Sequence, residues 1–208
     1  MACRTNRSRA CTPWLVAALV AVGINLQWAD AASVMFVTDT AAHLDGDDSV
    51  VERLEMLGHT VETIDHLDVM DTDPINDGFE LIVITSSTNS ANVGFHFTEA
   101  PIPLINWENA LFDELMFSDA GITSASDVID VLDISHPLAG MMGLTQTGEI
   151  LVRETIDPVF HLIDTTNFAP GGVIIAEEPL SGGAAIAVFD EGVEMFDGSA
   201  APATRISL

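Results

Sequence analysis

The sequence predicts an α/β protein with a flavodoxin-like, doubly wound, mostly parallel sheet and a more β-rich C-terminal half. The first observation is in residues 33–64, where the pattern is that of a strand, a helix and a second strand. This order implies a parallel crossover. The second observation is in residues 101–115, where a buried strand is expected to turn sharply at 106–108 into a helix. Such a corner lies at the carboxyl edge of a parallel sheet, where open α/β folds bind their ligands.

The first half of the chain alternates apolar strand patterns with helical ones. Strands are expected at residues 33–37, 59–64, 80–85 and 102–105. Between the first two strands, residues 49–52 (SVVE) fit a capping box that begins a helix. Gly58 stands where such a helix ends. A second helix is expected at residues 109–116, directly after the corner.

The second half contains mostly strand patterns. They cover residues 125–132, 148–153, 172–176, 184–189 and 205–208. A glycine-rich link at 180–183 predicts a hairpin between two of them, and the SHPLAG motif around His136 predicts a turn into a short segment. No repeat and no second domain is visible. Residues 32–208 are therefore expected to form one domain, either complete or truncated at its C-terminus.

The first 31 residues have the pattern of a signal peptide. Three arginines precede a short apolar run at residues 14–24, and residues 29–31 (ADA) fit a cleavage motif of small residues. The apolar run is too short for a permanent transmembrane helix; an uncleaved N-terminal anchor is the alternative. We therefore expect residues 1–31 to be removed and the protein to be secreted, periplasmic or at the cell surface.

The composition is strongly acidic, with a formal net charge of −26 and no lysine. Such a surface repels nucleic acid and anionic membranes, so neither is an expected partner after cleavage. The charge suits high salt or divalent cations, and a hydrophobic fraction of 48% argues against disorder. Both cysteines, Cys3 and Cys11, precede the cleavage site. The mature chain therefore has no thiolate nucleophile, disulfide or cysteine-bound metal.

Five stretches occur in a recognisable order: MFVTDT, VVERLEMLGHTV, ELIVITSSTNSANVGFHF, PIPLINWENALFDEL and ISHPLAGM. Together they resemble the class I glutamine amidotransferase-like superfamily, and within it the secreted bacterial branch similar to trehalose-utilisation (ThuA-like) domains. The resemblance implies a flavodoxin-like sheet. In that family the corner after the fourth strand carries a catalytic cysteine, whereas Glu108 stands at the matching position here. The family's late His-Pro-Glu motif is also absent, so glutaminase activity is not expected.

Polar side chains follow the predicted strands and should meet at the carboxyl edge of the sheet. These candidate ligand-binding residues are Asp39, Thr40, Ser86, Ser87, Asn89, Asn106 and Trp107. Trp107, the only tryptophan of residues 32–208, could stack on a carbohydrate or another small ligand, or it could anchor the core. The alternative for the polar residues is that each one caps its own helix or turn.

Two residues are candidates for catalysis. Glu108 at the corner could act as a general base or a metal ligand, or it could interact with free N–H groups at the start of the predicted helix. His136 could be an acid–base group, or a hydrogen-bonded turn residue. His43 and His96 could join Asp39 and Glu108 around a metal, but no known metal-binding spacing supports this. No metal site or cofactor is therefore predicted, with a loosely held divalent cation as the exception.

Three functions remain open at this point. The first is a secreted binding or accessory module of an extracellular protein, without glutaminase activity. The second is a hydrolase or sugar-modifying enzyme that uses Glu108 with His136 or Asp39. The third is a surface-display segment whose acidic face binds Ca²⁺. The sequence does not specify the ligand or the oligomeric state.

Overall fold

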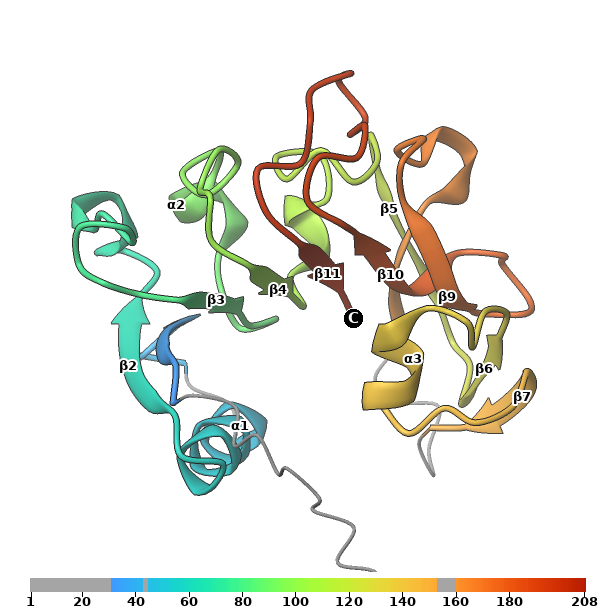
Figure 1. The fold of residues 1–208 in the computed structure, drawn as a ribbon, viewed down its shortest axis with the longest axis horizontal. Coiled ribbons are helices and arrows are strands. Elements are labelled where there is room, and N and C mark those ends of the chain that lie inside the picture. The colour runs from blue at the N-terminus through green and yellow to red at the C-terminus, as the bar shows by residue number, and fades with distance from the viewer. Residues whose placement is uncertain (1–30, 43–44, 153–159) are drawn as a thin grey trace, which may run out of the picture. The chain divides into compact units, whose positions relative to one another are not determined.

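The computed structural model describes residues 31–42, 45–152 and 160–208. The chain divides after residue 30, and residues 31–208 form the second unit, which is compact. The predicted signal peptide lies outside the described residues, apart from Ala31. In the described residues of the second unit, 11 strands form one sheet (Figure 1). Within these ranges no helix has the length and apolar character needed to cross a bilayer.

Five strands make the parallel half of the sheet. In spatial order they are β2 (Thr60–Asp65), β1 (Ser33–Thr38), β3 (Leu81–Ile84), β4 (Leu104–Asn106) and β11 (Arg205–Ser207). Each runs parallel to its neighbour. The strands expected in the first half of the sequence are therefore present, within a few residues of their predicted bounds.

The other six strands make the antiparallel half. β10 (Ala184–Phe189) continues the sheet beside β11 and is followed by β9 (Val173–Glu177), β6 (Val128–Val131) and β7 (Gly148–Leu151). β8 (Phe160–Ile163) pairs with β10 and with β5 (Gly121–Ser124). The predicted hairpin between β9 and β10 is present. β5 and β8 were not predicted, because neither has a clear alternation of apolar and polar residues.

Helices are few in the described residues. They are α1 (Asp45–Met56), α2 (Ser90–Val93) and α3 (Pro137–Met141), with 3₁₀ turns η1 (Val69–Asp71), η2 (Asn109–Leu111) and η3 (Thr165–Asn167). The predicted flavodoxin-like, mostly parallel sheet is therefore wrong: the sheet is mixed, and short turns replace most of the crossover helices that a doubly wound fold needs. The apolar strand patterns of the second half fit antiparallel neighbours equally well.

The helix expected at 109–116 is reduced to η2 and further turns. Leu111, Phe112 and Leu115 are buried, and so is Phe117, which lies just beyond the predicted helix. Met116 adopts a left-handed conformation with φ of 60°, and the N–H of Phe117 donates to the carbonyl of Phe112 at 2.8 Å. This closing pattern ends a helical segment.

The parallel half is covered by α1 on one face and by irregular segments on the other. Alternate residues of a strand point to opposite faces. Val34, Phe36 and Val83 pack with residues of α1 and with Trp107. Met35 and Ile82 point the other way, into a larger core that includes the aromatic side chains of Phe97, Phe112, Phe117 and Phe189. α1 begins at Asp45, four residues before its predicted start, and Gly58 follows its end with φ of 95°.

A buried arginine fixes β11 to the segment before β4. Arg205 is 1% exposed, and its guanidinium donates hydrogen bonds to the carbonyl oxygens of Phe97, Ala100 and Ile102. Burial lowers the pKa of Arg205 to about 10, although the charge of Glu99 acts in the opposite direction. The carbonyl oxygens partly replace the water that this cation loses on burial.

Candidate functional site

The topological switch point of the parallel half lies between β1 and β3. The chain leaves β1 for β2 on one side, and β3 pairs with β1 on the other side. Chain segments that leave the carboxyl ends of such strands separate there, which creates a crevice suited to ligands. The register pairs Val37 with Ile84, so the residues that follow these two, Thr38 and Thr85, lie side by side at this edge.

Four side chains form a hydrogen-bonded group at the switch point, which we call the switch-point cluster: Thr38, Asp47, Thr85 and Ser87. The Oδ2 atom of Asp47 accepts hydrogen bonds from the hydroxyls of Ser87 at 2.7 Å, Thr38 at 2.8 Å and Thr85 at 3.3 Å. The Ser87 hydroxyl also contacts those of Thr38 at 2.7 Å and Thr85 at 2.8 Å. The cluster joins β1, α1 and the loop after β3.

Asp47 is the main residue of this cluster that the sequence did not reveal. Asp47 is 7% exposed and lies in the first turn of α1. The capping box at 49–52 placed the helix start too late, so Asp47 was assigned to a loop. The acidic run at 45–48 was the available signal, because carboxylates are favoured in the first turn of a helix.

Three of the predicted ligand-binding residues stabilise local turns. The Oδ1 atom of Asp39 accepts hydrogen bonds from the N–H groups of Ala41 and Ala42, both at 2.9 Å. Thr40 donates to the carboxylate of Asp65 from its backbone N–H and its hydroxyl. Asn89 caps α2 by accepting from the N–H of Ala91 at 3.1 Å. Only the backbone N–H of Asp39 reaches the cluster, at 3.3 Å from the Ser87 hydroxyl.

The corner after β4 is closed by its own hydrogen bonds. The buried amide of Asn106 donates to the carbonyl oxygen of Glu108 at 2.9 Å and accepts from the Glu108 N–H at 3.2 Å. The Oε1 atom of Glu108 accepts from the N–H of Ala110 at 3.0 Å, so the carboxylate caps η2. Glu108 is 8% exposed. Burial raises the pKa of Glu108, and the hydrogen bond from Ala110 opposes this rise.

A second carboxyl group lies close to Glu108. Burial raises the pKa of Glu114 to about 7, and the hydrogen bond with Asp113 and the charges of Asp113 and Glu108 act in the same direction. The Oε2 atom of Glu114 is buried and has no hydrogen-bond partner among the described residues. The corner therefore contains two carboxyl groups whose charged forms are disfavoured.

His136 lies at the opposite edge of the sheet from Glu108. It caps α3, because its Nδ1 atom accepts from the N–H of Leu138 at 3.2 Å, and its Nε2 atom lies 3.4 Å from Oδ2 of Asp190. Asp190 follows Phe189, which pairs with the start of β11, whereas Asn106 pairs with its end. A separate cavity of about 280 Å³ includes His136, Met141 and Asp190 in its lining.

A cavity of about 410 Å³ lies beside the corner, and we call it the Trp107 cavity. Its lining consists of Ser86, Trp107, Ile129, Met142, Val152, His161, Ala185, Ile186 and Leu208. Ser86 and Trp107 were predicted as ligand-binding residues and occur together here. The other seven come from elements that are distant in the sequence, so no local motif could identify them.

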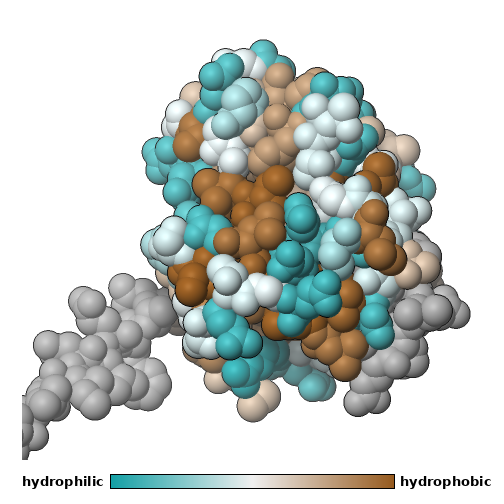
Figure 2. Space-filling view, turned by 90° about the vertical axis from the view of Figure 1, so that its right-hand side faces the viewer, coloured by the Kyte–Doolittle hydropathy of each residue, from teal (hydrophilic) through white to brown (hydrophobic). Residues whose placement is uncertain are grey.

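Hydrophobic residues are also exposed in the antiparallel half. Figure 2, which views the side of β6 and β7, shows hydrophobic residues near its centre with hydrophilic ones around them. Large apolar side chains exposed in this part of the chain include Leu132, Met142, Leu151 and Val152. Met142 and Val152 also line the Trp107 cavity.

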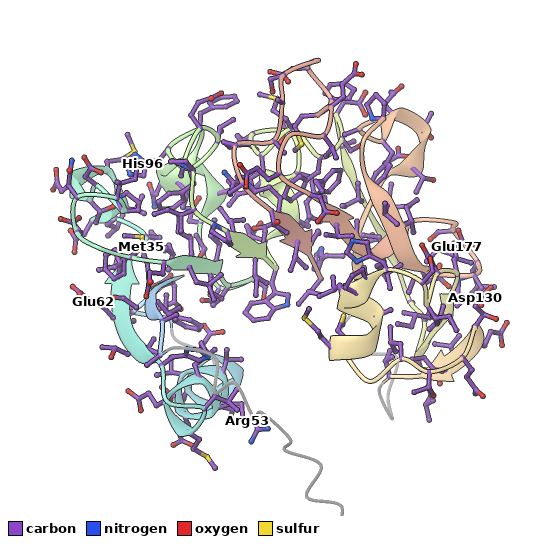
Figure 3. The ribbon with its side chains drawn as sticks, viewed as in Figure 1. Met35, Arg53, Glu62, His96, Asp130 and Glu177 are labelled. Carbon is purple, nitrogen blue, oxygen red and sulfur yellow. The ribbon has the colours of Figure 1, made fainter. Side chains whose placement is uncertain are left out.

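A row of three carboxylates crosses the antiparallel half of the sheet. Asp130 of β6 pairs with Glu149 of β7 on one side and with Glu177 of β9 on the other. The side chains of Asp130 and Glu177 lie close together at the right of Figure 3. Neither this row nor any other group of three or more His, Cys, Asp and Glu residues in the described part of the chain is placed to hold a metal ion.

The proposed metal set of Asp39, His43, His96 and Glu108 is only partly described. His43 lies outside the described residues. The Nε2 atom of His96 lies 3.5 Å from the hydroxyl of Thr72, in a different cavity from that of Trp107. Asp39 and Glu108 use their carboxylates for the turn and cap described above.

Comparison with known proteins identifies no family. No protein-family model matches the sequence, and no curated protein matches it. Among solved structures, the fold is similar to a glutamine amidotransferase from Thermotoga maritima, with a TM-score of 0.49 and 7% sequence identity. The similarity covers 85% of this chain and 74% of that one. A likeness of this degree assigns no reaction to the present chain.

Proposed function

We propose that residues 32–208 form a secreted amidotransferase-like module that binds a small ligand and has no glutaminase activity. One observation carries the proposal. The corner that bears the nucleophile in glutaminases here bears Glu108, whose carboxylate is buried and bonded to the N–H of Ala110. The Trp107 cavity lies next to this corner. The geometry therefore favours binding over nucleophilic attack at this position.

The positions of His136 and Asp39, the two predicted partners of Glu108, support the same proposal. A catalytic carboxylate needs a second group within hydrogen-bond reach to move a proton. His136 is bonded at the other edge of the sheet, and the Asp39 carboxylate is bonded to its own turn. The mature chain also has no cysteine to serve as a nucleophile.

We also propose, from the sequence, that the protein is secreted and related to the ThuA-like branch. The N-terminal pattern at 1–31 supports export, and the net charge of −26 makes nucleic acid and anionic membranes poor partners. An accessory role within a longer extracellular protein is consistent with a module that binds and does not react.

Two measurements on the purified chain test the proposal. Incubation with glutamine should release no ammonia above the buffer level, and a thermal-shift screen of neutral, cationic and anionic small molecules should find a ligand. That ligand should no longer stabilise the Trp107→Ala variant, because the indole forms part of the cavity. Ammonia release that is lost in Glu108→Gln would overturn the proposal. So would a ligand whose effect is unchanged in Trp107→Ala.

A hydrolase is the second candidate, favoured by the two carboxyl groups at the corner. Burial raises the pKa of Glu108, and that of Glu114 to about 7, and perturbed carboxyl groups are common in active sites. In this function one group would donate a proton while the other stays ionised. A glycoside or ester substrate whose turnover survives unchanged in both Glu108→Gln and Glu114→Gln would rule out these two residues.

A further inference from the structure

We infer that the Trp107 cavity takes an uncharged, mostly apolar small molecule with one hydrogen-bonding end, and not a polyhydroxylated sugar. This inference rests on the proposed binding function and specifies its ligand class. Six of the lining side chains are apolar: Ile129, Met142, Val152, Ala185, Ile186 and Leu208. The polar ones are Ser86, His161 and the indole N–H of Trp107.

The polar end of the cavity is held by the switch-point cluster. Ser86, which is exposed, lies between Thr85 and Ser87, and both of these neighbours donate to the carboxylate of Asp47. The backbone N–H of Trp107 donates to the carbonyl of Ile84 at 2.9 Å, on the same strand end. The Ser86 hydroxyl and the indole are therefore presented from a fixed edge, as preorganised binding groups are.

The apolar wall of the Trp107 cavity is part of a packed hydrophobic core. Ile129 is 4% exposed and Ile186 is 7% exposed, and both pack in the core between β6, β9 and β10. An apolar ligand placed here removes hydrocarbon surface from water on both sides of the contact. A sugar would bring hydroxyl groups against a wall with no hydrogen-bond partners, and unpaired buried hydroxyls oppose binding.

Charge decides between neutral and anionic ligands. The chain has a net charge of −26, and the lining residues that the structure describes include no arginine or lysine. Its potential lowers the local concentration of anions, and among the described lining residues His161 is the only one that can carry a positive charge. An acid should therefore bind much more weakly than the alcohol of the same shape.

Three small molecules that do not absorb near 280 nm separate these classes: cyclohexylmethanol, cyclohexanecarboxylate and glucose. The full chain is titrated with each one while tryptophan emission is recorded. Cyclohexylmethanol should shift the emission to shorter wavelength and saturate, because it removes water from the Trp107 indole. The other two should have at least 10-fold weaker effects. Trp14 and Trp28 add a background, which the Trp107→Phe variant measures.

Two adjacent methionines provide a matched pair of variants. Met142 lines the Trp107 cavity and is 40% exposed, whereas Met141 is 80% exposed and lines the cavity of His136. Met142→Asp should weaken cyclohexylmethanol binding at least 10-fold, and Met141→Asp should change it less than two-fold. Ser86→Ala, at an exposed position, should weaken the alcohol several-fold and leave binding of methylcyclohexane unchanged.

The outcomes separate this inference from the proposed function. Glucose or cyclohexanecarboxylate binding as tightly as the alcohol, with loss in Trp107→Phe, would overturn the ligand class while the binding module stands. Equal effects of Met141→Asp and Met142→Asp in folded variants would move the site away from this cavity. If Met142→Asp fails to fold, an alcohol affinity unchanged in Ser86→Ala overturns the assigned polar end. No saturable shift with any of the three molecules overturns the inference.

Discussion

The Ser87 hydroxyl lies 2.7 Å from the Oδ2 atom of Asp47, which bonds the loop after β3 to the first turn of α1. Asp47→Ala should destabilise the fold by about 2–3 kcal/mol, because three hydroxyl groups lose a charged acceptor in a buried site. Asp47→Asn should cost less, since an amide oxygen still accepts. Urea unfolding measures both, with the exposed Glu55→Ala in the same helix as control. Equal stability of Asp47→Ala and Glu55→Ala would contradict this role.

Arg205→Met should destabilise the protein by about 3–5 kcal/mol, because the carbonyl oxygens of Phe97, Ala100 and Ile102 lose their buried donor. Arg205→Lys should also be costly, since one ammonium group does not match the spread of a guanidinium. The same change at the exposed Arg53 of α1, Arg53→Met, is the control (Figure 3). A loss below about 1 kcal/mol would show that water replaces the guanidinium.

The raised pKa of Glu114 should make stability depend on pH. The folded value is about 7 and the ordinary value is 4.5, so the folded state holds the proton more tightly than the unfolded state. The contribution of Glu114 to stability is therefore highest below about pH 4.5, falls as the pH rises toward 7, and is level above that. Glu114→Gln should remove most of this fall and stabilise the protein near pH 8 by on the order of 1 kcal/mol, after solvent screening.

Urea unfolding of the wild-type protein and of Glu114→Gln at several pH values between about 4 and 8 tests this prediction. The Glu108→Gln variant serves as a comparison, because burial raises the pKa of Glu108 in the same direction. Parallel curves for the wild-type protein and Glu114→Gln would mean that Glu114 titrates alike in the folded and unfolded chains.

Asp130→Asn should stabilise the sheet at low salt by roughly 0.5–1 kcal/mol, because it removes the middle charge of the row with Glu149 and Glu177. The gain should shrink as salt is added, since the repulsion is screened. Glu62→Gln on β2 is the control, because Glu62 pairs with Met35 and faces no carboxylate across the strand. Thermal unfolding at low and high salt measures this gain. A gain in stability that is the same at both salt concentrations would point to a cause other than charge.

The sequence predicts strands well and their connections poorly. β1 and β3 of the parallel half have continuous apolar runs, which can be recognised locally, as in residues 81–84. Pairing direction is set by contacts between distant segments, so the hairpin of β9 and β10 was the one antiparallel pair predicted among the described strands. The helix expected at 109–116 is replaced by turns that end at the left-handed Met116, and Phe112 and Phe117 pack in the same core.

The candidate site likewise contains residues that the sequence predicts and residues that it does not. Ser86 and Trp107 could be predicted because each directly follows an apolar strand, and the edge of a sheet gathers such residues. Asp47 was missed through a misplaced helix start. The apolar wall formed by Ile129, Met142 and Ile186 exists only in the tertiary structure, since these residues come from separate elements.

β11 occupies a place in the sheet that determines how the protein must fold. It lies between β4 and β10, and among the described strands it alone joins the parallel half to the antiparallel half. Before residues 205–207 arrive, β4 and β10 each present an unpaired edge, and such edges can pair with other chains. Contacts between distant segments also form slowly. Chains whose synthesis pauses before β11 should therefore aggregate readily. Pairing of β11 with β4 and β10 should remove this tendency.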